Sequence, residues 1–374
     1  MTADESELRE LRASVREFLD SKSPEEAVRK LMESEPRFDP AVWSQAADQL
    51  RLPGLAIPEE YGGDGFGLVE LGVVLEEMGR ALFCAPFFAT VLLAAQALLA
   101  SGDKEACARF LPGIASGRTT ATLAVAEEHG SWDPAMVSAR AVPDGDGGWT
   151  VRGRKCFVID GTTADLILVV ARTVAGPTLF AVQREATGLT AEPMETLDAT
   201  RAMARLTLEA VPATLVGAQG AGGRVMAKVL DIASVGLAAE QAGGARRCLE
   251  TSADYARVRH QFGRPIGSFQ AVKHKCADML VQVELAEASS REAARLADED
   301  SPDSPDFPVA AAVAHACCSR AYTLAAMENI QVHGGIGFTW EHPAHLYFRR
   351  AKSSQLLFGG PAVYHERLLD RLGI

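Results

Sequence analysis

The residues best suited to chemistry lie in segment 259–270, which reads Arg-His-Gln-Phe-Gly-Arg-Pro-Ile-Gly-Ser-Phe-Gln. The planar guanidinium of Arg259 suits paired, charge-assisted hydrogen bonds to diphosphate oxygens. The glycines and the proline favour a turn that brings the backbone and aromatic rings close to a planar ligand. The segment therefore predicts a site for phosphate groups and a flat ring system, with these polar and aromatic neighbours: Gln261, Phe262, Phe269 and Gln270.

A second corner of similar composition follows at 331–338, with the sequence Gln-Val-His-Gly-Gly-Ile-Gly-Phe. Glycines after a helical pattern favour a C-terminal cap, and a capped turn also exposes backbone groups to a ligand. A plain helix cap is the alternative interpretation of Gly334 and Gly335. For Arg259 the alternative is a surface position at a helix end, and for the phenylalanines it is packing in the core.

Helical and β-prone stretches follow one another in three regions. Residues 1–118 are helical in pattern, with Gly/Pro breaks, and predict an all-helical domain. Residues 119–216 contain short β-prone runs separated by turn clusters, and predict a β-domain. Residues 217–374 return to helix and predict a bundle; in it, one stripe of apolar residues is expected to be buried, namely Val272, Cys276, Met279, Leu280 and Val283. The fold class expected is α+β.

Composition excludes several classes of function. The chain has 37 basic and 49 acidic residues. Its net charge of −12 repels nucleic acid and anionic membranes at long range. Seven cysteines without a CxxC pair predict reduced thiols in a cytoplasmic protein, and no zinc site. The uncharged run 81–100 is long enough to cross a bilayer, but Pro86 interrupts it and no basic or aromatic flank follows. A buried helix is expected there, and no membrane span.

Hydrolase and metal chemistry are also disfavoured. The chain has no Gly-x-Ser-x-Gly elbow for a nucleophilic serine. His342 and His345 form a close pair without an acidic or cysteine partner set, so no metal site is expected.

The two corners, at this separation, resemble the C-terminal half of the acyl-CoA dehydrogenase family of flavoenzymes. The order of helices, β-domain and helical bundle is also similar to that family over nearly the whole chain. Further landmarks that resemble family motifs are 57–63, 75–80, 212–217, 337–343 and 350–352. The resemblance implies an N-terminal helical domain, a middle β-barrel or β-sandwich and a C-terminal four-helix bundle. It also implies FAD as cofactor and an acyl-CoA thioester as substrate.

The resemblance implies roles for the residues of both corners. Arg259 resembles the family arginine that meets the FAD diphosphate. Gln261, Phe262, Phe269 and Gln270 resemble residues that line the cofactor or contact another subunit. Gln331, Gly334 and Gly335 resemble residues that meet the adenine side of an FAD held mainly by a neighbouring subunit. The resemblance therefore implies a dimer or tetramer with FAD at the subunit interface.

The family's reaction removes a proton next to the thioester and transfers a hydride from the next carbon to the flavin, which leaves an enoyl-CoA. The base is commonly a glutamate in a Tyr-Glu-Gly-Thr type sequence, and Phe358 stands at that position here. Another branch places the base near the position of Ala233, where the glutamate is also absent. Glu240 lies on the same helix face as Ala233, but two turns, about 10 Å, further along the axis. It is the remaining candidate for the base.

The flavin-facing segments depart from the family pattern as well. Residues 126–133 replace a Thr-Glu-Pro-Gly-Ala-Gly-Ser-Asp type loop and lack its threonine hydroxyl, for which Ser131 is a partial substitute. Residues 157–160 replace a Trp-Ile-Thr-Asn type strand, and an apolar side chain stands in place of the hydroxyl. These losses contrast with the retained corners at 259–270 and 331–335.

This asymmetry leads to the hypothesis that the chain is one subunit of a heteromeric acyl-CoA dehydrogenase, and that a paralogous subunit carries the base. Such paired subunits occur in actinobacterial members of the family that act on sterol side chains, which extends the expected substrates from fatty acids to sterols in β-oxidation. One alternative is a homo-oligomeric dehydrogenase with an unusual base. Another is a non-catalytic subunit that binds acyl-CoA or flavin. The expected electron acceptor is an electron-transfer flavoprotein.

Overall fold

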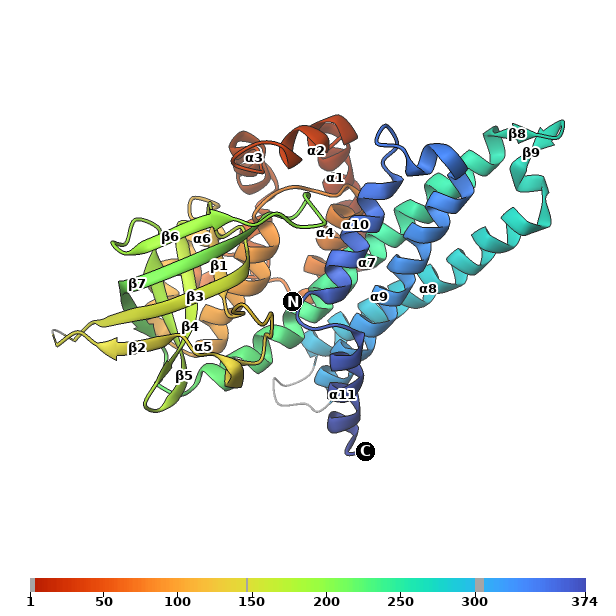
Figure 1. The fold of residues 1–374 in the computed structure, drawn as a ribbon. Coiled ribbons are helices and arrows are strands. Elements are labelled where there is room, and N and C mark those ends of the chain that lie inside the picture. The colour runs from red at the N-terminus through yellow and green to blue at the C-terminus, as the bar shows by residue number, and fades with distance from the viewer. Residues whose placement is uncertain (1–3, 146, 300–305) are drawn as a thin grey trace. The chain divides into compact units, whose positions relative to one another are not determined.

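The computed structural model describes residues 4–145, 147–299 and 306–374, which divide into two compact units. One unit holds Lys30–Phe66 and Cys84–Ala233, and the other holds residues 4–29, Gly67–Phe83 and Ser234–Ile374. Along the chain, helices come first, a block of β-strands follows, and long helices complete the order (Figure 1). The expected α+β sequence of elements is confirmed.

The first unit contains helices α3 (Pro40–Leu50), α5 (Gln96–Ser101) and α6 (Lys104–Ala115), with a π-helical segment at Phe88–Ala95. All residues of Phe88–Ala95 are buried, and the segment packs on the first strand, where Thr90 Oγ1 lies 3.1 Å from the carbonyl oxygen of Ala121. The run at 81–100 is thus enclosed as expected, although its helical part begins only after Pro86. Within the described residues, no helix is both long and apolar enough to span a bilayer.

The strands of the first unit form one sheet that closes on itself. The strands are β1 (Ala121–Ala124), β2 (Arg140–Pro143), β3 (Trp149–Ile159), β4 (Leu166–Thr173), β5 (Gly176–Gln183), β6 (Leu189–Pro193) and β7 (Met203–Val216). Six of them are ordered β1-β4-β2-β3-β7-β5, and β6 pairs with β7. β5 also pairs with β4, which closes a barrel. β4 is buried along nearly its whole length, as expected for its run of Leu, Ile and Val in the centre of the domain.

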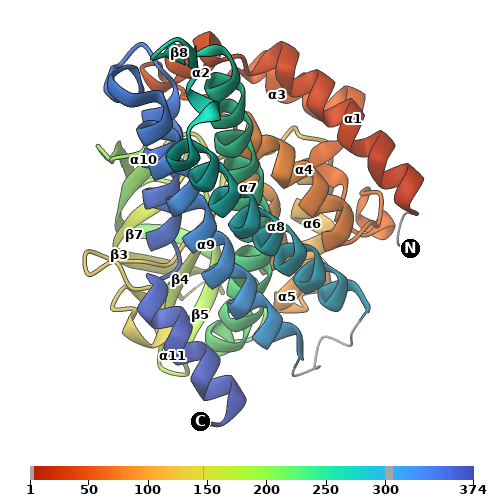
Figure 2. The same cartoon turned by 90° about the vertical axis from the view of Figure 1, so that its right-hand side faces the viewer.

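The second unit is a set of helices with one short hairpin. Its elements are α1 (Glu5–Lys22), α4 (Leu68–Arg80), α7 (Gly222–Val258) from Ser234 onward, β8 (His260–Gln261), β9 (Arg264–Pro265), α8 (Gln270–Glu299), α9 (Asp306–His333), α10 (Ala344–Leu356) and α11 (Pro361–Leu372). α2 (Glu25–Met32) crosses the division between the units. Helices α8 and α9 pack side by side, and α10 and α11 also pack on α9 (Figure 2).

Close backbone packing and ion pairs join the helices of the second unit. A Cβ atom on Gly79 would overlap the carbonyl oxygen of Glu240, so the glycine lets α4 and α7 touch. Arg16 ties α1 to α4 through Glu77, with Nε 2.8 Å from Oε2. The carboxylate of Asp298, near the end of α8, accepts hydrogen bonds from the first backbone amides of α4, at 2.7 Å from Leu68 N.

The predicted buried stripe on α8 is correct only in part. Met279 and Val283 are fully buried, whereas Val272 and Cys276 are half-buried and Leu280 is 44 % exposed. The prediction was wrong for Leu280 because a residue that follows Met279 directly is rotated about 100° away from it on a helix. With Val281 and Leu285, each 56 % exposed, Leu280 forms a partly exposed apolar face of α8.

Candidate active site

The segment at 259–270 forms a tight hairpin between α7 and α8 (Figure 1). Phe262 and Gly263 form its two-residue turn, with φ of 53° and 75°, and His260 and Gln261 pair with Pro265 and Arg264. Positive φ at both positions is the geometry of a type I′ hairpin turn. The ring of Phe262 is 90 % exposed, so plain core packing does not explain this residue.

Arg259 directly follows the end of α7, and hydrogen bonds hold its backbone on both sides. Its N–H donates to the carbonyl oxygen of Tyr255 at 2.9 Å, and its own carbonyl oxygen accepts from Ile266 N at 2.8 Å. The side chain is exposed, and within the described residues its guanidinium has no hydrogen-bond or ion-pair partner. The charge is therefore held in place by the backbone and is open to a ligand.

The other residues of this corner differ in how they are held. The half-buried ring of Phe269 contacts Phe262 edge to face at 6.0 Å and has the guanidinium of Arg264 above it at 4.1 Å. Gln261 is exposed, and its amide donates to the carbonyl oxygen of His260 at 2.9 Å. Gln270 is exposed at the start of α8. Phe269 is thus an anchor for the hairpin, while the two glutamines point to its surface.

The second corner lies where α9 ends. Gly334 has a φ of 64°, which fits the predicted helix cap. A Cβ on Gly334 or Gly335 would meet no atom within 4 Å, so the backbone of this corner is open on its outer side. Gln331 is also exposed.

The structure brings the two corners together. The ring of His333, at the end of α9, lies 4.3 Å from the ring of Tyr255, one turn before Arg259 on α7. His333 is itself fixed, because its Nδ1 lies 2.8 Å from the carbonyl oxygen of Asn329. Segments about 70 residues apart in the sequence therefore share one end of the helical unit. Their role in binding a cofactor stays a prediction.

Phe358 lies between α10 and α11 in an uncommon conformation. Its φ is 63° and its side chain is fully buried. A bulky residue with positive φ is strained by about 1–2 kcal/mol, and such strain concentrates at functional positions. No acidic residue lies between Lys352 and Tyr364, so this segment offers no proton acceptor. Ala233 is fully buried and offers none either.

Glu240, the remaining candidate for the base, is held in a buried ion pair. Arg350 Nη1 on α10 donates to Glu240 Oε1 on α7 at 2.9 Å, and the side chains are only 6 % and 8 % exposed. The sequence did not indicate this pair, because the two residues are 110 positions apart and each lies in an ordinary helical pattern. A base held in this way would have to leave its guanidinium partner before it could accept a proton.

The two predicted flavin-facing segments are neighbours in the first unit. Cys156 N donates to the carbonyl oxygen of Ala126 at 2.8 Å, and a Cβ on Gly130 would lie 3.7 Å from the ring of Phe157. Ser131 is half-buried, and its Oγ accepts from Asp133 N at 3.1 Å, which leaves its proton free to be donated. Ile159 is only 1 % exposed, so the apolar substitution in this strand is part of the barrel core.

A buried ion pair that the sequence interpretation missed holds the first of these segments. Lys155 Nζ lies 2.9 Å from both Glu127 Oε1 and the carbonyl oxygen of Val125. Burial alone raises the pKa of Glu127, but hydrogen bonds from Ser138 and Ala139, together with the Lys155 charge, lower it to about 2. The acidic and basic residues were visible in the sequence, but their pairing depends on the register of the barrel.

The histidines at 342 and 345 have local roles. His342 Nδ1 accepts from Ala344 N at 3.2 Å, and the ring of His345 stacks on Trp340 at 4.6 Å. Across the described ranges, no group of three or more His, Cys, Asp or Glu residues is arranged to hold a metal ion.

Comparisons with protein families cover nearly the whole chain. Residues 5–118 match the family model "Acyl-CoA dehydrogenase, N-terminal domain". Residues 122–211 match the middle domain of the same family, and residues 220–373 match its C-terminal domain.

Individual relatives and solved structures give the same result. "Acyl-CoA dehydrogenase IpdE2" of Mycobacterium tuberculosis is 36% identical over 358 residues, which cover 96% of this chain and 95% of that protein. A chain of the Tcur3481-Tcur3483 steroid ACAD, solved as a variant, is 36% identical, with a TM-score of 0.88 and 98% of both chains covered. A chain of the ChsE4-ChsE5 complex from Mycobacterium tuberculosis is 31% identical, with a TM-score of 0.88 and coverage of 99% and 98%.

Proposed function

Because the chain belongs to the acyl-CoA dehydrogenase family of CH–CH oxidoreductases, we propose that it serves in the FAD-dependent α,β-desaturation of an acyl-CoA thioester. We propose further that it is the subunit without a catalytic base in a heteromeric enzyme, and that a paralogous subunit carries the glutamate. The observation that supports this most is Phe358, a fully buried apolar side chain at the position of the usual family base.

The exposed end of the helical unit suits one side of an FAD. Arg259 presents a guanidinium without a described partner, which would form charge-assisted hydrogen bonds with the diphosphate. The open backbone at Gly334 and Gly335 and the amide of Gln331 would meet the adenine side. All of these residues are exposed, which suits a cofactor shared with another subunit. Phe262, in the hairpin turn, would also contact the FAD.

The residue that removes the substrate proton differs between the proposed function and its alternatives. FAD, when bound, supplies the hydride acceptor, and a carboxylate must remove the proton beside the thioester. Phe358 and Ala233 cannot do this, and Glu240 is neutralised by Arg350 at 2.9 Å. A homo-oligomeric enzyme with Glu240 as base would require that buried pair to open at each turnover. The same pair is consistent with a non-catalytic subunit, which the test below distinguishes by turnover.

The solved relatives suggest the kind of assembly and substrate. Two structures that resemble this chain are named for pairs of proteins, Tcur3481-Tcur3483 and ChsE4-ChsE5, and the first is called a steroid ACAD. We infer a heteromeric dimer or tetramer that acts on a sterol side-chain or fatty acyl-CoA, with the exposed apolar face of α8 at a subunit contact. We assign the chain to the cytoplasm and re-oxidation to an electron-transfer flavoprotein. The domain boundaries that we propose are 1–118, 119–216 and 217–374.

The test uses the complex formed when this chain is co-expressed with a paralogous subunit that carries the family glutamate. Arg259→Gln should lower the FAD content and the turnover of the purified complex, while the Arg152→Gln control, at an exposed position of the barrel, should leave both unchanged. Equal FAD content in both variants would overturn the role of Arg259. A complex that retains FAD but never oxidises an acyl-CoA would favour the non-catalytic alternative.

A further inference from the structure

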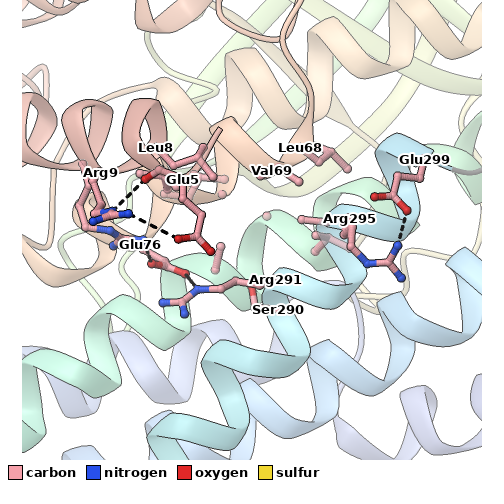
Figure 3. Close-up of a pocket in the computed structure, with 18 residues that line it drawn as sticks. Glu5, Leu8, Arg9, Leu68, Val69, Glu76, Ser290, Arg291, Arg295 and Glu299 are labelled. Carbon is pink, nitrogen blue, oxygen red and sulfur yellow. Dashed lines mark hydrogen bonds and ion pairs between the residues drawn. The ribbon is translucent and has the colours of Figure 1, made fainter. Parts of the chain in front are cut away.

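A pocket of about 630 Å³ lies within the helical unit, bounded by α1, α4, α7 and α8 (Figure 3). This volume is within the usual range for small-molecule sites. None of its lining residues belongs to the corners at 259–270 and 331–335. It is therefore a separate candidate site.

The pocket exists because small side chains line it where the helices diverge. Gly72 on α4 would place a Cβ only in ordinary contact with Ala239, at 4.0 Å, so the space beside it is empty. Ala239 and Ala294 are almost fully buried, and Val73 and Val235 add apolar surface. A well-packed helical core fills such gaps with larger residues, because voids are destabilising.

Fixed contacts on its sides keep the pocket from collapsing. Asp298 joins the end of α8 to the start of α4, with its oxygens 2.7 Å from Leu68 N and 2.8 Å from Val69 N. Arg12 joins α1 to α4 by ion pairs with Glu76 at 2.5 Å and Glu77 at 3.0 Å. The walls are thus set before any ligand arrives, which limits the entropy that binding must overcome.

Arginines that could meet an anion line the pocket together with carboxylates. Figure 3 shows Arg9 with Glu5, and Arg291 with Glu76, along one side, and Arg295 with Glu299 on the other. The lining holds four arginines, Arg9, Arg12, Arg291 and Arg295, and three carboxylates, Glu5, Glu76 and Glu299. Glu77, Glu287 and Glu292, outside the lining, also pair with these arginines. Glu76 already accepts from Arg12 and lies 3.6 Å from Arg291.

Two of these arginines are free to change partner at little cost. Arg9 and Arg295 pair only with carboxylates of their own helices, and their side chains are 76 % and 44 % exposed. Exposed ion pairs of this kind add little to the stability of the fold. Each guanidinium can therefore turn toward an anionic group at the mouth without loss of a structural contact.

We propose that this pocket binds an amphipathic monocarboxylate. Its hydrocarbon part lies against Val73, Val235 and Ala239, and its carboxylate meets Arg9 or Arg295 at the mouth. This inference does not depend on the proposed reaction, because it concerns a different cavity and requires neither FAD nor a partner's base.

Isothermal titration of the purified full-length chain with sodium decanoate tests the proposal, with 1-decanol as the uncharged comparison. The wild-type chain should bind decanoate at one site and bind 1-decanol more weakly. Gly72→Leu fills the pocket from α4 and should abolish binding. The double variant Arg9→Gln with Arg295→Gln should weaken it by about tenfold, as expected for a lost charge-assisted hydrogen bond. Arg152→Gln is the matched control and should bind like the wild type.

Several results would overturn the proposal. They are no decanoate binding to the wild type, unchanged binding to Gly72→Leu, and equal binding of decanoate and 1-decanol. Unchanged binding to Gly72→Leu would place the probe elsewhere in the chain, for example at an acyl site. Circular dichroism checks the fold of each variant, and Ala294→Leu fills the same space from α8 if Gly72→Leu does not fold.

Discussion

Arg350 Nη1 donates to Glu240 Oε1 at 2.9 Å, and this pair joins α10 to α7 inside the helical unit. Both side chains are nearly inaccessible to water. Removal of one partner leaves a buried charge without its counterion, which is strongly destabilising, whereas removal of both is often tolerated. The pair is therefore expected to be structural, and this expectation differs sharply from that for a catalytic base.

We expect Glu240→Gln to lower the free energy of unfolding by about 3–5 kcal/mol, measured by urea denaturation. The double variant Glu240→Leu with Arg350→Met should recover most of that loss and retain turnover in the heteromeric complex. A Glu240→Gln chain of normal stability whose complex has lost all turnover would instead identify Glu240 as the base.

Because of the Glu127–Lys155 pair, we expect low pH to destabilise the barrel. Because the pKa of Glu127 is lowered to about 2 in the folded state, its carboxylate stabilises the fold at pH values above its unfolded pKa of about 4.5. That stabilisation is lost as the pH falls from about 4.5 to 2. Thermal denaturation followed across this range should show a steep loss of stability. In the Glu127→Gln variant, stability should fall less steeply with decreasing pH. An equal dependence of stability on pH in both proteins would contradict this role of Glu127.

A substitution at His315, which stacks on Tyr364, is expected to stabilise the fold. The rings stack at 3.5 Å, His315 is 1 % exposed, and neither of its nitrogens has a hydrogen-bond partner in the described part of the chain. His315→Phe keeps a ring against Tyr364 and removes the buried polar atoms, so we expect a gain of about 1 kcal/mol at pH 7 by urea denaturation.

The same substitution should change the response to acid. Burial lowers the pKa of His315 to about 3, so the folded state binds this proton less readily than the unfolded state. The stabilisation that comes from the neutral imidazole of His315 is therefore fully present above pH 6.5 and is lost as the pH falls toward 3. This loss should be smaller in His315→Phe, and a less stable variant at pH 7 would indicate that the imidazole has a partner.

The order of the three regions was predictable because each has a local pattern. Strand-forming runs such as 166–170 lie between turn clusters, and the helices repeat apolar residues at three- and four-residue steps. A turn within 259–270 was also predictable, since its glycines and proline favour a chain reversal, but the positive φ of Phe262 was not.

Tertiary contacts set the features that were not predicted. Helical periodicity indicates a buried stripe but not its width, so Leu280 was wrongly included. The Glu240–Arg350 and Glu127–Lys155 pairs depend on how distant elements pack, and sequence spacing does not determine that packing. The pocket beside Gly72 similarly results from the divergence of helices that are separated along the chain.

We expect this chain to need a partner subunit that supplies the base. The most direct measurement is the visible flavin spectrum, recorded without oxygen, after acyl-CoA thioesters are added to the chain alone and to the co-expressed complex. We predict that the chain alone is colourless or unresponsive, and that the flavin of the complex is bleached by a sterol side-chain or fatty acyl-CoA. Bleaching of a flavin bound to the chain alone would contradict this account.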